Sequence, residues 1–217
     1  KQAAGTMPKN PIVVKTIVTT NIIEAIAKDY GVEVVNVLTG FKFIGEQIAK
    51  LEAKGETERY LFGFEESYGY LCGTYVRDKD AVVASMLILE MAAYYKKQGK
   101  SLVDVLKETY AKYGRYFNRT DNFAFEGAKG MQEMAEMMAK LRAEQPKEIG
   151  GLKVLEFLDY QCSRGYRLAD GTEYPITLPS SDVVEFKLED NAGVIVRPSG
   201  TEPKIKFYYT TKGRDTA

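Results

Sequence analysis

Histidine is absent from the 217-residue sequence. The chain therefore lacks the commonest general base and the commonest metal ligand of proteins. A Ser-His-Asp or Cys-His mechanism cannot operate within this chain, because both need an imidazole to move the proton. Chemistry or binding in this chain must rely on carboxylates, hydroxyls, Lys, Arg and backbone groups.

Cysteine is scarce, and its spacing is not that of a ligand set. Cys72 and Cys162 stand alone, with no C-x-x-C pair, so we expect two reduced thiols. With no histidine either, a structural zinc site is excluded. The sequence predicts no metal site in this chain.

Charge of one sign and long apolar runs are also lacking. The 30 Lys and Arg balance the 30 Asp and Glu, which argues against nucleic acid as a partner but leaves room for one local basic pocket. The apolar run 81–91 is too short to span a bilayer, and no secretory signal pattern opens the chain. We therefore expect a cytoplasmic protein with no membrane partner.

The first half alternates between strand and helix patterns. Residues 12–19, 32–38 and 60–64 are apolar and rich in β-branched or aromatic side chains, as in buried strands. Between them lie two helical patterns, one opened by Asn21 and stopped by Gly31, the other stopped by Gly55. This order predicts parallel strands with right-handed crossovers, and hence an α/β domain with a mixed sheet flanked by helices.

The segments that follow these three strands are expected at one edge of the sheet. They are Thr19-Thr20, Thr39-Gly40-Phe41-Lys42 and Glu65-Glu66-Ser67. Open α/β sheets bind ligands at the carboxyl edge, and helix N-termini there favour anions. The sequence therefore predicts a binding site at this edge.

Two more helices are predicted before the chain changes character. Residues 80–98 are apolar on most of their surface, which predicts a helix buried on several sides. Ser101 and Asp104 form a capping-box pattern that opens the next helix, with Gly114 at its end. We expect four apolar side chains of that helix to point inward: Leu102, Val105, Leu106 and Tyr110.

The second half predicts a smaller α+β domain, an antiparallel sheet packed on a helix. Residues 115–125 show no clear helix pattern, and residues 131–141 form an amphipathic helix whose methionines are expected to fill a core. Short alternating runs separated by turn signals follow. They are residues 153–160, 166–168, 182–188, 193–197 and 204–211. We place the domain boundary near Gly114, giving domains 1–114 and 115–217.

The segment Gly63-Phe64-Glu65-Glu66-Ser67-Tyr68-Gly69 carries the first candidate site. Adjacent carboxylates on a loop cannot both point the same way, so Glu65 and Glu66 present several acceptor oxygens, and Ser67 adds a hydroxyl. Such a set suits a polyhydroxylated ligand. A solvated acidic turn has the same composition, and the position at the sheet edge makes the two interpretations nearly equal.

The segment Arg197-Pro198-Ser199-Gly200-Thr201-Glu202-Pro203-Lys204 joins two predicted strands. Arg197 offers a planar fork for phosphate, Ser199 and Thr201 add hydroxyls, Gly200 allows a close approach of backbone N–H groups, and Lys204 adds charge. An ordinary hairpin loop has the same turn formers. Glu202 counts against anion binding unless it points away.

Two further charged segments have an ordinary structural explanation besides a binding role. Lys42 could pair with a phosphate or a sugar oxygen beside Gly40, although a surface lysine in a first helical turn is the more common case. Arg77-Asp78-Lys79-Asp80 fits a solvated helix start with acids at its N-terminus.

The three loops TGFKFIG, GFEESYG and RPSGTEPK, in this order and at this spacing, resemble the last two of the four domains of the α-D-phosphohexomutase superfamily. Phosphoglucomutases are the most similar branch, and phosphomannomutase-type members are the alternative. The resemblance covers essentially the whole chain. It implies that this is a fragment whose other partners are the missing N-terminal domains and a hexose phosphate.

The resemblance also implies roles for the residues of the loops. The third-domain loop would place Glu65 and Ser67 on the sugar hydroxyls with Glu66 alongside, and Gly40 and Lys42 in the other active-site loop. The fourth-domain loop would grip the substrate phosphate. Its residues are Arg197, Ser199, Gly200 and Thr201, with Lys204 a less certain addition.

The chemistry implied by the family lies outside this sequence. A phosphoserine of the first domain would exchange its phosphoryl group with the sugar through glucose 1,6-bisphosphate, converting glucose 1-phosphate to glucose 6-phosphate. Mg²⁺ would be held by three aspartates of the second domain, whereas Asp78 and Asp80 are only a pair. We expect no catalytic residue in this fragment and no activity from it alone; a stand-alone sugar-phosphate binding module is the other hypothesis.

Overall fold

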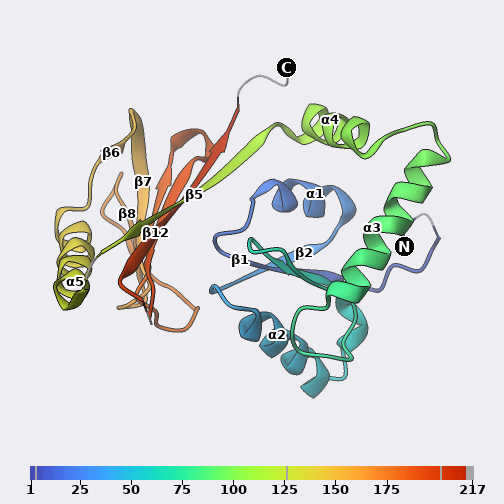
Figure 1. Cartoon of the computed structure of the whole chain (residues 1–217), viewed down its shortest axis with the longest axis horizontal. Helices are drawn as coiled ribbons and strands as arrows, with labels where there is room; N and C mark the ends of the chain where they lie inside the picture. The colour runs from blue at the N-terminus through green and yellow to red at the C-terminus, as the bar shows by residue number, and fades with distance from the viewer. Residues whose placement is uncertain (3, 126, 201, 214–217) are drawn as a thin grey trace. The chain divides into compact units, whose positions relative to one another are not determined.

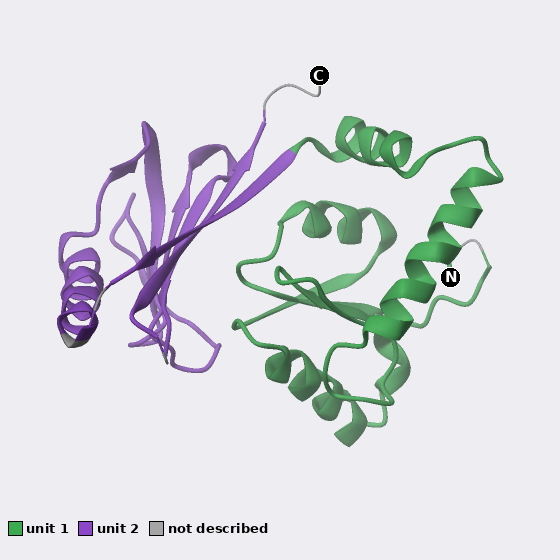
Figure 2. Cartoon of the chain, viewed as in Figure 1, with its two compact units in different colours: residues 1–115, 214–217 green, residues 116–213 purple. Residues whose placement is uncertain are grey.

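The structure is a computed structural model that describes residues 1–2, 4–125, 127–200 and 202–213. Two compact units divide the chain between Arg115 and Tyr116, and Figure 2 colours them separately. Thr201 lies outside the described residues.

Unit 1 contains a sheet in the order β2-β1-β3-β4. Strand β1 pairs in parallel with β2 and β3, and β3 pairs antiparallel with β4. In Figure 1 the helices α1 and α2 lie on opposite faces of this sheet. The strands are β1 Ile12–Thr16, β2 Glu33–Val37, β3 Tyr60–Glu65 and β4 Gly69–Leu71, and the helices are α1 Ile22–Tyr30, α2 Phe41–Ala53, the 3-10 turn Thr57–Arg59, α3 Ala81–Lys96 and α4 Leu102–Tyr113.

The core of unit 1 forms where one face of the sheet meets α2. Every residue of β1 is buried, as expected for a central strand covered on both faces. Helix α2 buries Phe41, Ile44, Gly45, Ile48 and Leu51, an apolar stripe at helical spacing. The predicted strand-helix-strand-helix-strand order and the mixed sheet are confirmed, and the short strand β4 is an addition that the sequence did not reveal.

Helix α3 corrects a prediction. It forms where expected, but none of its residues is buried, so the expectation of a helix buried on several sides is wrong. Val82 is 72 % exposed and Leu89 is 69 % exposed. Apolarity all round a helix favours burial only if other elements cover it, and in the described part of the chain the neighbours of α3 do not.

Helix α4 keeps its predicted ends but not its predicted inner face. The Ser101–Asp104 capping box is present, and Gly114 caps the C-terminus. Leu102 and Leu106 are exposed, whereas Val105 and Tyr110 are half-buried. The inward placement of the two leucines was therefore wrong, because this helix buries no residue.

Unit 2 is an antiparallel sheet packed on α5 Gly127–Glu144, as the sequence predicts. The sheet order is β5-β12-β11-β10-β7-β8-β9, and β6 pairs with β7. Met134 and Met138 of α5 are buried in the core with Phe157 and Phe186, which confirms the core-filling role of these methionines. The strands are β5 Tyr116–Ala124, β6 Glu148–Ile149, β7 Leu152–Asp159, β8 Arg164–Arg167, β9 Glu173–Pro175, β10 Val184–Leu188, β11 Gly193–Pro198 and β12 Lys204–Lys212, with the 3-10 turn Glu189–Asn191.

Residues 115–125 show no clear helix pattern in the sequence, and the structure places β5 there. It is an edge strand of the sheet and pairs with β12 along its whole length. Most of its residues are exposed. An edge strand that buries little lacks the apolar alternation by which strands are recognised, so the pattern was missed.

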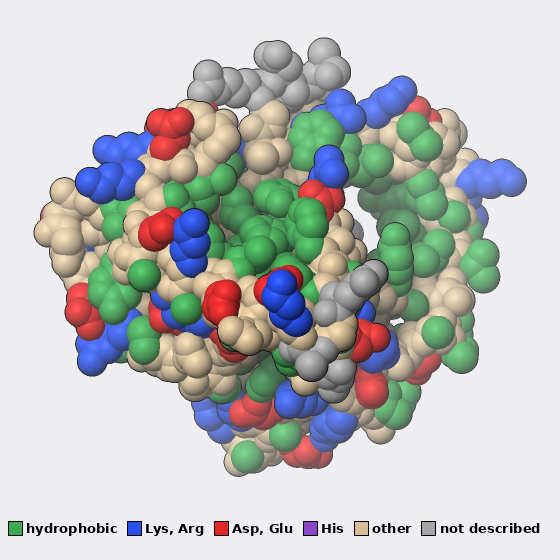
Figure 3. All heavy atoms as spheres, turned by 60° about the vertical axis from the view of Figure 1, so that its left-hand side comes forward, with side chains coloured by type: hydrophobic (Ala, Val, Ile, Leu, Met, Phe, Trp, Pro, Cys, Tyr) green, Lys and Arg blue, Asp and Glu red, His purple; other side chains and the backbone are tan. Residues whose placement is uncertain are grey.

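Charge on the surface is mixed. On the face drawn in Figure 3, Lys and Arg side chains are interspersed with Asp and Glu, and no continuous basic stripe is seen. No helix of the described residues is long and apolar enough to cross a membrane.

Candidate functional site

The carboxyl edge of the unit 1 sheet carries the first group of predicted site residues. The chain leaves β1 to form β2 on one side and later returns to form β3 on the other side. Strand order therefore reverses at β1, and ligands of open α/β sheets bind in the crevice at such a switch point. The segments after β1, β2 and β3 meet at this edge because the three strands are parallel.

Glu66 is tied to the end of β1. The Thr16 hydroxyl donates a hydrogen bond to Glu66 Oε2 at 2.8 Å, and Thr19 Oγ1 lies 3.5 Å from the same oxygen. Thr16 is fully buried and Thr19 is 6 % exposed. A hydroxyl at the end of β1, 50 residues earlier in the chain, therefore holds one oxygen of this carboxylate, and a second hydroxyl lies beside it.

Glu65 has a different partner from Glu66. Its side chain is 10 % exposed, and its Oε1 lies 3.9 Å from Lys79 Nζ. Burial raises the pKa of Glu65, which Lys79 opposes, while the nearby carboxylates Glu66 and Asp78 add to the rise. The two adjacent carboxylates thus have separate partners, as the sequence argument required.

Gly69 makes room for the Glu65 side chain. A Cβ on Gly69 would lie 2.7 Å from Glu65 Oε1 and 2.8 Å from its Cγ. Between Glu65 and Gly69, Ser67 is exposed, and Tyr68 adopts a φ of 61° and is 86 % exposed. The loop therefore presents one hydroxyl and one aromatic side chain to solvent, next in sequence to two anchored carboxylates.

Gly40 and Lys42 lie at the N-terminus of α2, on the same edge. Gly40 is the N-cap, with a φ of 120° that favours glycine. Lys42 is exposed, and its Nζ lies 4.9 Å from the centroid of the Phe43 ring. A helix N-terminus beside a cation can attract an anion.

Lys79 also lies near this edge, although its sequence predicted only a solvated position at a helix start. Its Nζ lies 5.4 Å from the centroid of the Phe41 ring, besides pairing with Glu65 and with Asp78. The segment that contains it was interpreted as a helix start. That interpretation is confirmed for Asp80, whose side chain caps α3 by accepting from the amides of Val82 and Val83.

The predicted phosphate loop connects β11 and β12 in unit 2. Arg197 on β11 is directly opposite Lys206 on β12, and Lys206 is opposite Asn122 on β5. Side chains of directly opposite residues lie on the same face of the sheet, with Cβ atoms about 4.5–5.5 Å apart. Two cations and an amide therefore share one row beside the loop, and the sequence argument named only Arg197.

Within the loop, the polar groups are paired locally. Ser199 Oγ accepts a hydrogen bond from the Glu202 amide at 3.3 Å, and Lys204 Nζ forms an ion pair with Glu202. This ion pair lowers the pKa of Glu202. Gly200 is exposed, and a Cβ there would meet nothing within 4 Å.

Among the described residues, the pair Asp78 and Asp80 does not fit a metal ion. Asp80 is occupied as a helix cap and also accepts from the Tyr75 hydroxyl, and Asp78 pairs with Lys79. Among the residues that the structure describes, no three His, Cys, Asp or Glu side chains gather closely enough to hold an ion.

Comparisons with known proteins agree with this architecture. Residues 1–113 match the sequence profile of phosphoglucomutase/phosphomannomutase α/β/α domain III, and residues 122–217 match that of the C-terminal domain. The profile of domain III covers about half of the chain. The chain therefore belongs to the phosphoglucomutase/phosphomannomutase family.

Two of the relatives that the chain resembles are bacterial phosphoglucomutases. The chain is 39 % identical to that of Staphylococcus haemolyticus over 93 % of its own length and 36 % of the relative's. It is also 39 % identical to that of Staphylococcus aureus, over 94 % of its length and 36 % of the relative's. The chain thus spans about a third of the length of the relatives it matches.

A solved structure shares the fold. The open form of parafusin, an exocytosis-sensitive phosphoprotein and phosphoglucomutase from Paramecium, superposes with a TM-score of 0.63 at 18 % identity. The match covers 99 % of this chain and 35 % of that one.

Proposed function

We propose that this chain is the substrate-recognition part of a phosphoglucomutase that interconverts glucose 1-phosphate and glucose 6-phosphate. The observation that carries the proposal is the loop at the switch point of the unit 1 sheet. There, Glu65 and Glu66 are anchored in different directions and Ser67 is exposed between β3 and β4. Fixed carboxylate oxygens beside a hydroxyl match the donors and acceptors of a sugar ring.

Each half of the ligand has its own set of groups in this proposal. Glu65, Glu66 and Ser67 accept from and donate to the sugar hydroxyls, with Gly40 and Lys42 beside them. Arg197, Ser199, Gly200 and Thr201 hold the phosphate, which the Arg fork can bind through two parallel hydrogen bonds. Lys206 adds a second charge next to Arg197.

Catalysis belongs to the rest of the longer protein. A phosphoserine and Mg²⁺ outside this segment would supply the transfer, and glucose 1,6-bisphosphate would be the intermediate. Phosphoryl transfer depends mainly on positioning and electrostatic stabilisation, so a segment that only binds and orients the sugar phosphate has a distinct role. We expect the isolated chain to bind the sugar phosphate without converting it.

Calorimetric titration of the chain with four ligands tests the proposal. Glucose 1-phosphate should bind more tightly than either inorganic phosphate or glucose, because each of these fills only one set of groups. Equal affinity for glucose 1-phosphate and inorganic phosphate would contradict sugar recognition. Tighter binding of mannose 1-phosphate would instead favour a phosphomannomutase-type enzyme, since the family profile covers both.

A further inference from the structure

Lys15 is a buried cation in the centre of the unit 1 sheet. It lies on β1, is 1 % exposed, and follows three apolar residues of that strand. Removing an ammonium from water costs several kcal/mol unless the surrounding groups replace its hydration. The sugar-binding role proposed above does not use this residue, so its burial calls for a separate explanation.

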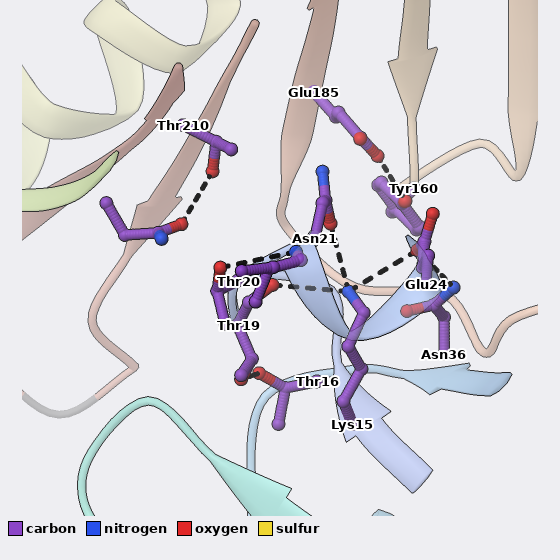
Figure 4. A network of polar contacts seen from close by, with 12 residues as sticks. Lys15, Thr16, Thr19, Thr20, Asn21, Glu24, Asn36, Tyr160, Glu185 and Thr210 are labelled. Carbon is purple, nitrogen blue, oxygen red and sulfur yellow. Dashed lines mark hydrogen bonds and ion pairs between the residues drawn. The ribbon is translucent and has the colours of Figure 1, made fainter. Parts of the chain in front are cut away.

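Oxygen atoms replace the hydration shell of Lys15. Its Nζ donates to the Thr19 carbonyl at 3.2 Å and to Asn21 Oδ1 at 3.1 Å, and it lies 3.6 Å from Glu24 Oε1. Figure 4 shows these contacts converging on Nζ. An ammonium has three donors, so these partners can account for all of them.

The turn after β1 is held from both faces of the sheet. Side chains alternate along a strand, so Lys15 and its neighbour Thr16 point to opposite faces. Lys15 holds the main chain of Thr19, while the Thr16 and Thr19 hydroxyls lie 2.8 Å apart. The position of Thr19 is therefore fixed at both its carbonyl and its hydroxyl (Figure 4).

The hydroxyl protons determine which group donates and which accepts in each of these hydrogen bonds. Thr16 has one proton and donates it to Glu66 Oε2 at 2.8 Å. The 2.8 Å contact with Thr19 is then made by the Thr19 proton, with Thr16 as acceptor. Hydrogen bonds linked in this way polarise one another and strengthen the last one, which here ends on the carboxylate.

We propose that Lys15, Thr16 and Thr19 are positioning residues that fix the Glu66 carboxylate at the sugar-binding loop. Lys15 anchors the turn, Thr19 orients the Thr16 hydroxyl, and Thr16 holds one oxygen of Glu66. This leaves the other oxygen of Glu66 in a defined direction. The inference rests on the proposed role of the loop in sugar binding.

The architecture gives a reason for a charge at this place. An apolar side chain at position 15 would avoid the desolvation cost, and such replacements of buried ions are often neutral or stabilising. It would, however, remove the donor that holds Thr19 and Asn21. We therefore expect Lys15→Met to disturb the loop more than it disturbs stability.

The test compares Thr16→Val with Thr16→Ser by NMR. Valine keeps the shape but lacks the hydroxyl, and serine keeps the hydroxyl. In ligand-free protein, Thr16→Val should move the Glu66 carboxylate ¹³C and Ser67 amide resonances, and Thr16→Ser should leave them near their wild-type positions. Amides of residues 116–213 serve as the internal control for folding.

The same variants are then titrated with glucose 1-phosphate. A hydrogen bond to a charged group corresponds to roughly a tenfold or larger change in affinity, so Thr16→Val should bind about tenfold more weakly. Thr16→Ser should bind glucose 1-phosphate nearly as tightly as the wild-type chain does. Neither variant should change the binding of inorganic phosphate. If serine behaves like valine, or valine leaves both the resonances and the affinity unchanged, the proposal is overturned.

A measurement on the wild-type chain does not depend on the folding of any variant. The Thr16 hydroxyl proton is buried, so it should exchange slowly and show a nuclear Overhauser effect to the Glu66 side chain. Absence of this nuclear Overhauser effect would overturn the proposal. Failure of the wild-type chain to bind glucose 1-phosphate would contradict the proposed function instead, while the ligand-free spectra would still decide whether Thr16 positions Glu66.

Discussion

The two predicted recognition loops are built in different ways. The loop after β3 depends on distant residues, since Glu66 is held by Thr16 from a strand 50 positions away. The loop between β11 and β12 is organised by its own members, since Ser199 and Lys204 both pair with Glu202. Gly63 of β3, the strand that leads into the first loop, is buried, whereas Gly200 of the second loop has open space around it.

This difference suits the two parts of the ligand that the loops are proposed to recognise, the sugar hydroxyls and the phosphate. Sugar hydroxyls differ only in direction, so a loop that distinguishes them needs carboxylates held in place by a rigid scaffold. A phosphate is a compact anion that accepts donors from many directions, and a loop with a guanidinium fork and accessible backbone can adapt to it. The first loop should therefore be sensitive to changes in its surroundings, and the second to changes in its charge.

The largest predicted contrast concerns glycine. In Gly63→Ala the new Cβ would lie 2.3 Å from the Tyr60 hydroxyl and 2.5 Å from Ile44 Cγ2, an overpacking that costs about 1–3 kcal/mol. Gly200→Ala meets no atom within 4 Å and should change stability by less than about 0.5 kcal/mol. Urea unfolding measures both, and equal losses would contradict the contrast.

The next contrast concerns charge in the second loop. Arg197→Ala should weaken binding of inorganic phosphate about tenfold or more, because a charge-assisted bidentate contact is lost. Arg119→Ala is the matched control, since Arg119 is an exposed arginine of the same sheet paired with Asp121. Calorimetric titration should show the loss for Arg197→Ala alone, and an equal loss in the control would point to a general charge effect.

A third prediction concerns pH at the first loop. Burial raises the pKa of Glu65 above its ordinary value of 4.5, so ionised Glu65 destabilises the folded chain. Its unfavourable contribution is absent below pH 4.5 and grows as pH rises through the raised pKa. Glu65→Gln should therefore raise the free energy of unfolding at neutral pH, with the gain shrinking as the solution is acidified.

The control for this prediction is Glu46→Gln, which removes an exposed carboxylate paired with Lys50. Its effect on unfolding should be small at every pH. Sugar-phosphate affinity should also fall as pH drops through the Glu65 pKa, because the protonated carboxyl loses an acceptor. A Glu65 pKa at or below 4.5, followed by ¹³C NMR, would contradict the account.

The smallest predicted effect concerns Glu202. In Glu202→Gln the ion pair with Lys204 is lost, which leaves Lys204 available to an anion. Because exposed ion pairs are weak and screened by salt, phosphate affinity should rise only about twofold to threefold, and less at high salt. Titrations at two salt concentrations would measure this, and weaker binding by the variant would show that Glu202 supports the loop.

The sequence was sufficient for features encoded by local patterns. The alternation of strands and helices predicted the parallel sheet, and with it the shared edge of the segments after β1, β2 and β3. The Ser101–Asp104 capping box was found from two residues at a fixed spacing. These features depend on periodicity and backbone geometry, which a short stretch of sequence contains.

Features that depend on neighbours far along the chain were missed. The burial of α3 was predicted wrongly because its composition does not specify what covers it. Strand β5 is ordered by its pairing with β12, about 90 residues later. Lys206 became a candidate only when register placed it opposite Arg197, and Thr16 only when the end of β1 met the loop after β3.

The most direct test of the account is an NMR titration of isotope-labelled chain with glucose 1,6-bisphosphate. The account predicts amide shifts in both Glu65–Ser67 and Arg197–Gly200, because each loop is formed within its own unit. Shifts confined to Arg197–Gly200 would contradict the claim that the first loop is preformed for the sugar. A folded chain with no shift in either loop would contradict the assignment of both.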